Sequence, residues 1–123
     1  MSEGRVLLID SDTWQLGVYQ RFLKDAGFEY DSATNSSDAM EAIELKKPDA
    51  IVLDALLEGN SAFVLLHELQ SDAELSKIPV IMATNIAQDF SLKDVAPYGV
   101  KRLIDKTTVH PSDMVFSVRA VIA

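Results

Sequence analysis

Short strand-like runs alternate with stretches of helical periodicity along almost the whole of this sequence. The apolar run Ala50–Leu53, which has no polar alternation, is typical of a parallel strand covered by helices on both faces. Four further runs are interpreted as strands: Arg5–Ile9, Phe28–Ala33, Ile78–Ala83 and Lys101–Ile104. Strands that alternate with helices form parallel sheets through right-handed crossovers. We therefore predict an α/β fold with a five-stranded parallel sheet and helices on both faces.

Capping and breaking residues predict where the helices between these strands begin and end. Asp12 or Thr13 is expected to cap the first helix, and Gly27 to end it. The remaining signals are Asn35–Asp38 before the second helix, Asn60–Ser61 before the third, a weaker fourth helix over Ala87–Val95, and Pro111 in the first turn of the last helix. Because neither a linker nor an internal repeat is visible, we predict a single domain over residues 1–123.

The net charge and the composition of the chain argue against several classes of function. The 19 acidic and 11 basic residues give a formal net charge of -8, which is unlike the basic surface that nucleic-acid binding needs. The chain has no cysteine, and so no disulfide framework, thiolate nucleophile or cysteine-based zinc site. Neither a signal peptide nor a membrane-spanning run is visible in the sequence. We therefore expect a cytoplasmic protein that binds neither nucleic acid nor membrane.

Polar side chains follow four of the five predicted strands at the point where each strand ends. They are Asp10 and Asp12 after the first strand, Asp54 after the third, Thr84 after the fourth and Lys106 after the fifth. The carboxyl ends of parallel strands meet at one edge of a sheet, where α/β proteins bind ligands. Two carboxylates about 4 Å apart repel each other by about 4 kcal/mol at an effective dielectric constant near 20, so such a cluster needs a cation. Mg²⁺ suits all-oxygen ligands, and an ammonium with a hydroxyl suits a phosphate group.

A simpler interpretation of these residues stays open at this point. Asp54 on its own could cap the loop or the helix that follows it, and each of the other polar residues could cap its own strand end. The convergence of the whole set favours a shared site over this alternative.

These residues and their spacing resemble the receiver domain of two-component response regulators over nearly the whole chain. Asp54 stands at the position of the family's phosphoacceptor, Thr84 at that of its hydroxyl residue after the fourth strand, and Lys106 at that of its lysine. Asp10 stands at the first position of the family's acidic pair. The resemblance implies a flavodoxin-like fold with strand order 2-1-3-4-5.

The resemblance also implies a reaction and a metal. Asp54 would accept a phosphoryl group from a phosphohistidine on a sensor histidine kinase, giving an acyl phosphate. Mg²⁺ would be held by the carboxylates of Asp10, Asp12 and Asp54 and by the backbone carbonyl of Leu56. The chemistry of such a domain is its own phosphorylation and dephosphorylation, so we do not expect an enzyme that acts on a separate substrate.

A change of partner binding would follow from the reaction. Thr84 and Lys106 would bind the transferred group and shift the surface around the fourth helix and the fifth strand. A downstream protein target or an output domain would read that shift. A homodimer through the fourth helix, fifth strand and fifth helix is an assembly that the resemblance also implies.

Four positions depart from the family pattern. Ser11 takes the second position of the acidic pair, normally a metal ligand, although Asp12 next to it could reach the ion. Leu103 takes the place of an aromatic switch residue whose rotamer reports phosphorylation, and Glu58 and Ala62 replace a Pro and a Gly in the loop after the acceptor. We therefore expect weak Mg²⁺ binding and reduced coupling between phosphorylation and output.

Two other functions stay open. One is a phosphorylation-independent pseudo-receiver that only binds partners, against which tight Mg²⁺ binding would count. The other starts from Val6–Thr13, which is similar to the D-x-D-x-T motif of haloacid-dehalogenase-type phosphatases. In that motif Asp10 would be the nucleophile and Asp12 the general acid and base. This interpretation leaves Asp54 without a role, and it predicts that the phosphoryl group is found on Asp10.

Overall fold

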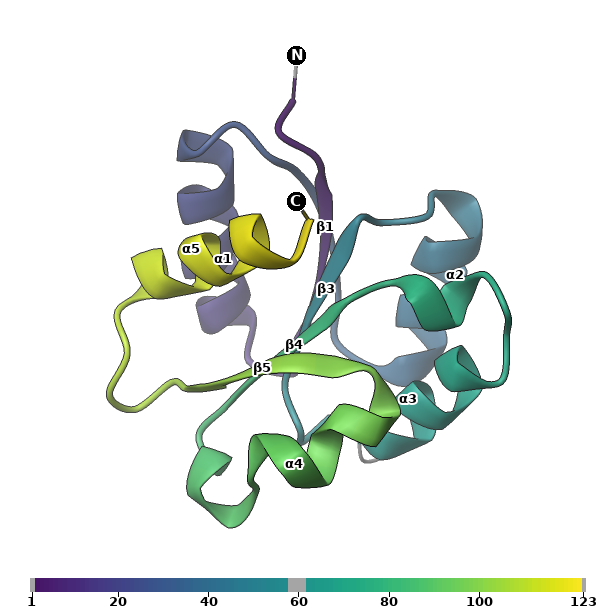
Figure 1. The fold of residues 1–123 in the computed structure, drawn as a ribbon. Helices are drawn as coiled ribbons and strands as arrows, with labels where there is room; N and C mark the ends of the chain where they lie inside the picture. The colour runs from purple at the N-terminus through teal and green to yellow at the C-terminus, as the bar shows by residue number, and fades with distance from the viewer. Residues whose placement is uncertain (1, 58–61, 123) are drawn as a thin grey trace.

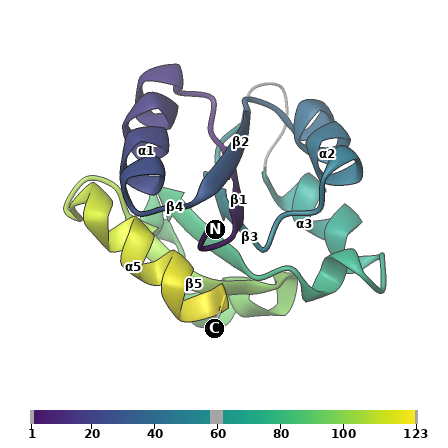
Figure 2. The same ribbon diagram turned by 90° about the horizontal axis from the view of Figure 1, so that it is seen from above.

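The computed structural model describes residues 2–57 and 62–122. A parallel sheet forms its centre, and the five strands lie in the order β2-β1-β3-β4-β5 (Figure 1; β2 is labelled in Figure 2). The strands are β1 (Arg5–Ile9), β2 (Glu29–Ala33), β3 (Ala50–Leu53), β4 (Val80–Thr84) and β5 (Val100–Asp105). The predicted α/β class and the strand order implied by the resemblance are both confirmed.

β1 and β3 lie next to each other inside the sheet and are buried on both faces. Their parallel register pairs Leu7 with Ile51 and Leu8 with Val52. Successive side chains of a strand point to opposite faces, so the first pair enters one hydrophobic cluster and the second pair enters the other. This two-sided burial explains why Ala50–Leu53 contains no polar residue.

Helices cover both faces of the sheet. They are α1 (Thr13–Asp25), α2 (Ser36–Leu45), α3 (Ala62–Gln70), α4 (Leu92–Val95) and α5 (Pro111–Ile122). Seen from above, α1 and α5 lie on one side of the sheet and α2 and α3 on the other (Figure 2). Among residues 2–57 and 62–122, no helix combines the length and the apolar character that crossing a lipid bilayer requires.

Side-chain caps fix the first turns of α1 and α2. Asp12, rather than Thr13, caps α1, and its Oδ1 accepts hydrogen bonds from the backbone N–H groups two and three residues further on, at 3.0 and 3.2 Å. Asn35 caps α2 by accepting a 2.8 Å hydrogen bond from the N–H three residues further on, as predicted. The expected cap of α3, Asn60–Ser61, lies outside the described residues.

The predicted fourth helix over Ala87–Val95 is wrong as a continuous element. The region contains a 3₁₀ turn at Ala87–Asp89, the short helix α4, and a second 3₁₀ turn at Ala96–Tyr98. Ser91 and Asp94 form a capping box, in which each side chain accepts a hydrogen bond from the backbone N–H of the other, at 3.2 and 3.1 Å. A capping box begins a helix, so it interrupts any helix that would run through Ser91.

β4 begins at Val80, two residues later than predicted. A 3₁₀ turn over Leu75–Lys77 precedes it, and Ile78 closes that turn. Pro79 has no N–H to give to a neighbouring strand, although its carbonyl accepts a 3.0 Å hydrogen bond from the N–H of Ile51. The proline therefore lies at the entrance of the strand.

Candidate functional site

Two buried carboxylates lie at the carboxyl edge of the sheet. Asp10 directly follows β1 and Asp54 directly follows β3, and the two strands are neighbours. The backbone N–H of Asp54 donates a 3.0 Å hydrogen bond to the carbonyl of Ile9, so the parallel pairing continues into the site. Asp10 and Asp54 are only 4% and 8% exposed. Their negative charges therefore need a partner inside the protein.

Lys106 is that partner. It follows β5, and its Nζ donates hydrogen bonds of 2.6 Å to Asp10 Oδ2 and 2.8 Å to Asp54 Oδ2. The lysine side chain is 4% exposed, so both ion pairs are shielded from water. Two carboxylates and one ammonium leave a net charge of about -1 in the cluster, which is suited to a further cation.

Burial and hydrogen bonding act in opposite directions on these charged groups. Burial would lower the pKa of Lys106, but the hydrogen bonds to Asp10 and Asp54 and the negative charges of these residues together outweigh that effect, and the pKa of Lys106 is raised above its ordinary value. Burial also raises the pKa of Asp10, and the hydrogen bonds from Lys106 and from the N–H of Asp12 offset only part of that rise. Lys106 is therefore a cation at physiological pH.

Backbone amides orient the other oxygen of each carboxylate. The N–H of Asp12 donates a 2.9 Å hydrogen bond to Asp10 Oδ1, and the N–H of Leu56 donates a 3.2 Å hydrogen bond to Asp54 Oδ1. Each donor lies two residues after its acceptor, which is the geometry of a short Asx turn. A carboxylate oxygen has two lone pairs, so each oxygen can accept one more ligand.

The side chain of Asp12 does not join this cluster. Its Oδ1 caps α1, as described above, and the residue is exposed. Within residues 2–57 and 62–122, no three acidic, histidine or cysteine side chains are grouped closely enough to hold a metal ion. Of the three expected carboxylate ligands, the structure brings together Asp10 and Asp54, whereas the carboxylate of Asp12 caps α1.

This donor set fits Mg²⁺. Magnesium keeps several waters and is commonly bound by one or two carboxylates together with oxygens of a phosphate group. Asp10 and Asp54 offer two buried carboxylates with free lone pairs, in a cluster that carries excess negative charge. A backbone carbonyl from the loop after Asp54 would be a third oxygen of the same chemical kind.

Thr84 and Leu103 lie on β4 and β5 but do not contact the carboxylates through any hydrogen bond of the described structure. Thr84 is buried, and its Oγ1 accepts a 3.4 Å hydrogen bond from the N–H of Ile86. Its backbone carbonyl accepts a 3.1 Å hydrogen bond from the N–H of Lys106, which ties the two strand ends together. Leu103 is half-buried against the cluster on the α2 and α3 side of the sheet.

Tyr19 is a residue near the site that the sequence did not single out. Its side chain is buried in the cluster formed with α1 and α5. Burial, and then the negative charges of Asp10 and Asp54, raise the pKa of its hydroxyl, which therefore stays protonated. The helical spacing of Tyr19 marks it as a core residue, and no local motif signals its closeness to the carboxylates.

Comparison with known proteins finds a family whose model covers most of the chain. The family "Response regulator receiver domain" matches residues 6–119. Protein PilH of Pseudomonas aeruginosa is 29% identical over 86 residues, which is 70% of this chain and 71% of PilH. The phosphate regulon transcriptional regulatory protein PhoB of the same species is 29% identical over 117 residues. That match covers 95% of this chain but only 51% of PhoB, so the chain spans about half of that protein.

A solved structure shares the fold. The receiver domain of the sensor histidine kinase PA1611 from Pseudomonas aeruginosa matches with a TM-score of 0.84 and 17% identity, over 97% of each chain. That crystal structure has a magnesium ion coordinated in its active site cleft. The sheet order, the acidic strand ends with their lysine, and the family match over residues 6–119 agree, and the chain belongs to the response regulator receiver domain family.

Proposed function

We propose that this chain is a single receiver domain over residues 1–123 that accepts a phosphoryl group on Asp54. The observation that carries the proposal is the place of Asp54 at the end of the middle strand β3, inside a buried cluster where Lys106 donates short hydrogen bonds to Asp54 and to Asp10. A carboxylate at the end of a central strand, with an ammonium already beside it, is suited to become a phosphorylated side chain. Membership of the family supports the same role.

The proposed transfer is a displacement at phosphorus. An oxygen of the Asp54 carboxylate forms a new P–O bond while the P–N bond of a phosphohistidine breaks. The imidazole leaves with the electron pair of that bond and takes up a proton from solvent, and the product is an acyl phosphate on Asp54. Lys106 donates to the new phosphoryl oxygens in place of the carboxylate oxygen it now binds, and Thr84 offers its hydroxyl to them.

The proposed metal ligands are Asp10, Asp54 and the backbone carbonyl of Leu56, with water completing the shell. Mg²⁺, when bound, supplies positive charge that offsets the negative charge of the phosphoryl oxygens. We propose weak binding, because Ser11 offers no carboxylate and the carboxylate of Asp12 is engaged as the cap of α1.

The proposed partners are a sensor histidine kinase as phosphodonor and a downstream protein target or an output domain as reader. Homodimers through α4, β5 and α5 belong to the same proposal, as does a cytoplasmic location. The chain acts on itself rather than on a separate substrate, so the proposal is a signalling domain whose chemistry is its own phosphorylation and dephosphorylation.

The test is the intact mass of the protein after incubation with acetyl phosphate, with and without Mg²⁺. The wild type is expected to gain one phosphoryl group in a Mg²⁺-dependent manner, and Asp54→Ala is expected to gain none. Asp89→Ala is a matched control, because it removes an exposed aspartate of a 3₁₀ turn. Peptide mapping of the modified protein then identifies the acceptor residue.

Two results would contradict the proposal. If no variant gains a phosphoryl group under any condition, the pseudo-receiver that only binds partners replaces it. A group that persists in Asp54→Ala and maps to Asp10 would restore the phosphatase-like interpretation. Lys106 contacts both aspartates, so geometry alone gives neither of them the nucleophile's role, and the peptide map decides.

A further inference from the structure

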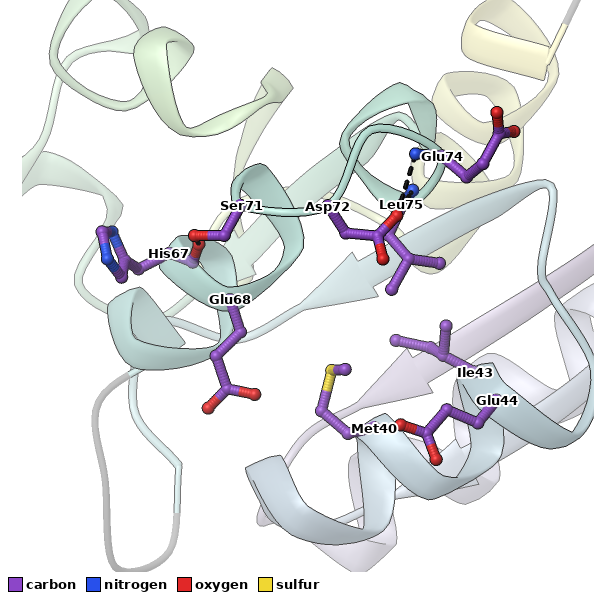
Figure 3. A pocket seen from close by; sticks show the side chains of 9 residues that line it. All are labelled: Met40, Ile43, Glu44, His67, Glu68, Ser71, Asp72, Glu74 and Leu75. Carbon is purple, nitrogen blue, oxygen red and sulfur yellow. Dashed lines mark hydrogen bonds between the residues drawn. The ribbon is translucent and has the colours of Figure 1, made fainter.

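A groove of about 600 Å³ opens between α2 and α3, away from the carboxylate cluster. Met40 and Glu44 of α2 face Glu68 of α3 across it (Figure 3). Its floor is apolar, since the half-buried side chains of Met40 and Leu75 and the buried side chain of Ile43 lie there, against the hydrophobic cluster on this side of the sheet. The groove is therefore continuous with the core of the domain.

Acidic side chains form the rim of the groove. Glu44, Glu68, Asp72 and Glu74 all line it. Glu74 is neutralised by Lys47 and Lys77, at 3.6 and 3.7 Å. Within the described residues, no cation lies within salt-bridge distance of Glu44 or Glu68. An apolar floor with uncompensated carboxylates on both walls complements a surface that is apolar and basic.

The backbone around the groove selects the kind of segment that can fill it. The walls are the helices α2 and α3, whose main-chain groups are hydrogen-bonded along each helix, and none of the described residues that line the groove belongs to a strand that could pair with an extended peptide. Ser71 Oγ and Asp72 Oδ1 are also engaged, since Ser71 donates to the carbonyl of His67 at 2.9 Å and Asp72 accepts two N–H groups at 2.8 and 3.0 Å. A helix satisfies its own backbone and offers only side chains.

We propose that this α2–α3 groove docks a basic amphipathic helix of a partner protein. Apolar side chains at helical spacing enter between Met40 and Leu75, and lysine or arginine side chains beside them pair with Glu44 and Glu68. This docking goes beyond phosphoryl transfer, because it uses no residue of the Asp10, Asp54 and Lys106 cluster. It is therefore tested on the unphosphorylated protein.

A second copy of the chain fits the groove less well. A two-fold symmetric contact places the same surface on both sides of the interface, so the acidic rims carrying Glu44 and Glu68 would face each other. Like charges that face each other across an interface are unfavourable. We therefore assign the groove to a different protein, and self-association becomes an outcome of the test.

The test uses a designed helical peptide of about five turns, with leucines on one face and lysines on the other. Backbone amide shifts of the ¹⁵N-labelled protein are followed during titration with this peptide, and with a control peptide in which every lysine is glutamate. We expect the basic peptide to shift the amides of α2, α3 and Leu75–Lys77, and the acidic peptide to leave them unchanged.

Matched variants separate the groove from general charge attraction. Glu44→Gln/Glu68→Gln removes two negative charges from the rim, whereas Glu41→Gln/Asp25→Asn removes two exposed charges that do not line it. We expect about fivefold weaker binding for the first variant, from two exposed ion pairs, and a change of less than about twofold for the second.

Any one of five results would overturn the proposal. The first is that both double variants lose the same affinity for the basic peptide, and the second is that the acidic peptide binds as well as the basic one. The third is that the amide shifts map elsewhere on the domain. The fourth is that the protein self-associates with rising concentration and that Glu44→Gln/Glu68→Gln alters this self-association. The fifth result is that no backbone amide shifts at the highest concentration at which the basic peptide stays soluble.

Discussion

Lys106 Nζ donates a 2.8 Å hydrogen bond to Asp54 Oδ2, and the same ammonium reaches Asp10 at 2.6 Å. One buried cation therefore compensates two buried carboxylates that come from different strands. Removing one partner of a buried ion pair is costly, because the remaining charge has neither water nor a counter-ion. The stability of the domain and its proposed chemistry thus depend on the same three side chains.

Lys106→Met is expected to lower the free energy of unfolding by about 3–5 kcal/mol at neutral pH. The loss should shrink in mildly acidic buffer, because burial raises the pKa of Asp10 and the variant lacks the Lys106 hydrogen bond that offsets part of that rise. The folded state then binds more protons than the unfolded state, so its stability increases as the pH falls. Urea denaturation at both pH values measures the effect. Lys101→Met, at an exposed position of β5, is the control, and equal losses in the two variants would show that the ion pairs contribute little.

Replacing Asp10 with asparagine is expected to weaken Mg²⁺ binding much more than replacing Asp12 with asparagine. Asp10→Asn removes a proposed ligand and should weaken binding by about an order of magnitude. Asp12→Asn should change it by less than about twofold, because asparagine is an equally good helix cap. The fluorescence of Trp14, which is 74% exposed in the first turn of α1, gives a readout for the titration. Comparable weakening in both variants would make Asp12 a ligand.

Asp72 is expected to contribute to stability in a pH-dependent manner. The N–H groups of Leu75 and Glu74 lower its pKa below the ordinary value of 3.8. Its contribution is therefore present above that value and is lost as the pH falls through the lower pKa of the folded state. Asp72→Asn should lower the melting temperature near neutral pH, and the difference from wild type should diminish in strong acid. Asp25→Asn, at another exposed position, should show no such pattern, and a constant difference at every pH would refute the assignment.

Ser36→Ala is expected to leave the free energy of unfolding unchanged or to raise it by up to about 1 kcal/mol. The Oγ of Ser36 is buried and has no hydrogen-bond partner among the described residues, and alanine removes that unpaired group from the first turn of α2. Ser37→Ala, at the exposed neighbouring position, reports the effect of helix propensity alone. A clear loss of stability in chemical denaturation of Ser36→Ala would mean that the hydroxyl is hydrogen-bonded in solution.

The strands were predictable because burial on both faces leaves a simple pattern in the sequence. Ala50–Leu53 is apolar throughout, and the polar residue that breaks the run, Asp54, marks the edge where ligands bind. Parallel topology alone then brings Asp10 and Lys106 to the same edge, although Lys106 is distant from both aspartates in sequence.

The remaining features depend on contacts that no local pattern encodes. Asp12 is both a good helix cap and a possible metal ligand by residue type, and only its geometry shows that its carboxylate is engaged as a cap. Ser91 and Asp94 divide the predicted fourth helix because their capping box outweighs the helical spacing around them. Tyr19 approaches the carboxylates through the packing of α1 on the sheet, which is a tertiary contact.

β5 is one of the two edge strands of the sheet, and its neighbour is β4. Lys106 extends from the end of this strand to carboxylates at the ends of β3 and β1, two and three strands further in. Its side chain thus links the edge strand β5 to the two strands β3 and β1 inside the sheet. A group that draws the ammonium away from Asp10 and Asp54 would remove these side-chain contacts at the end of β5, while the backbone pairing of β5 with β4 would hold the strand in the sheet.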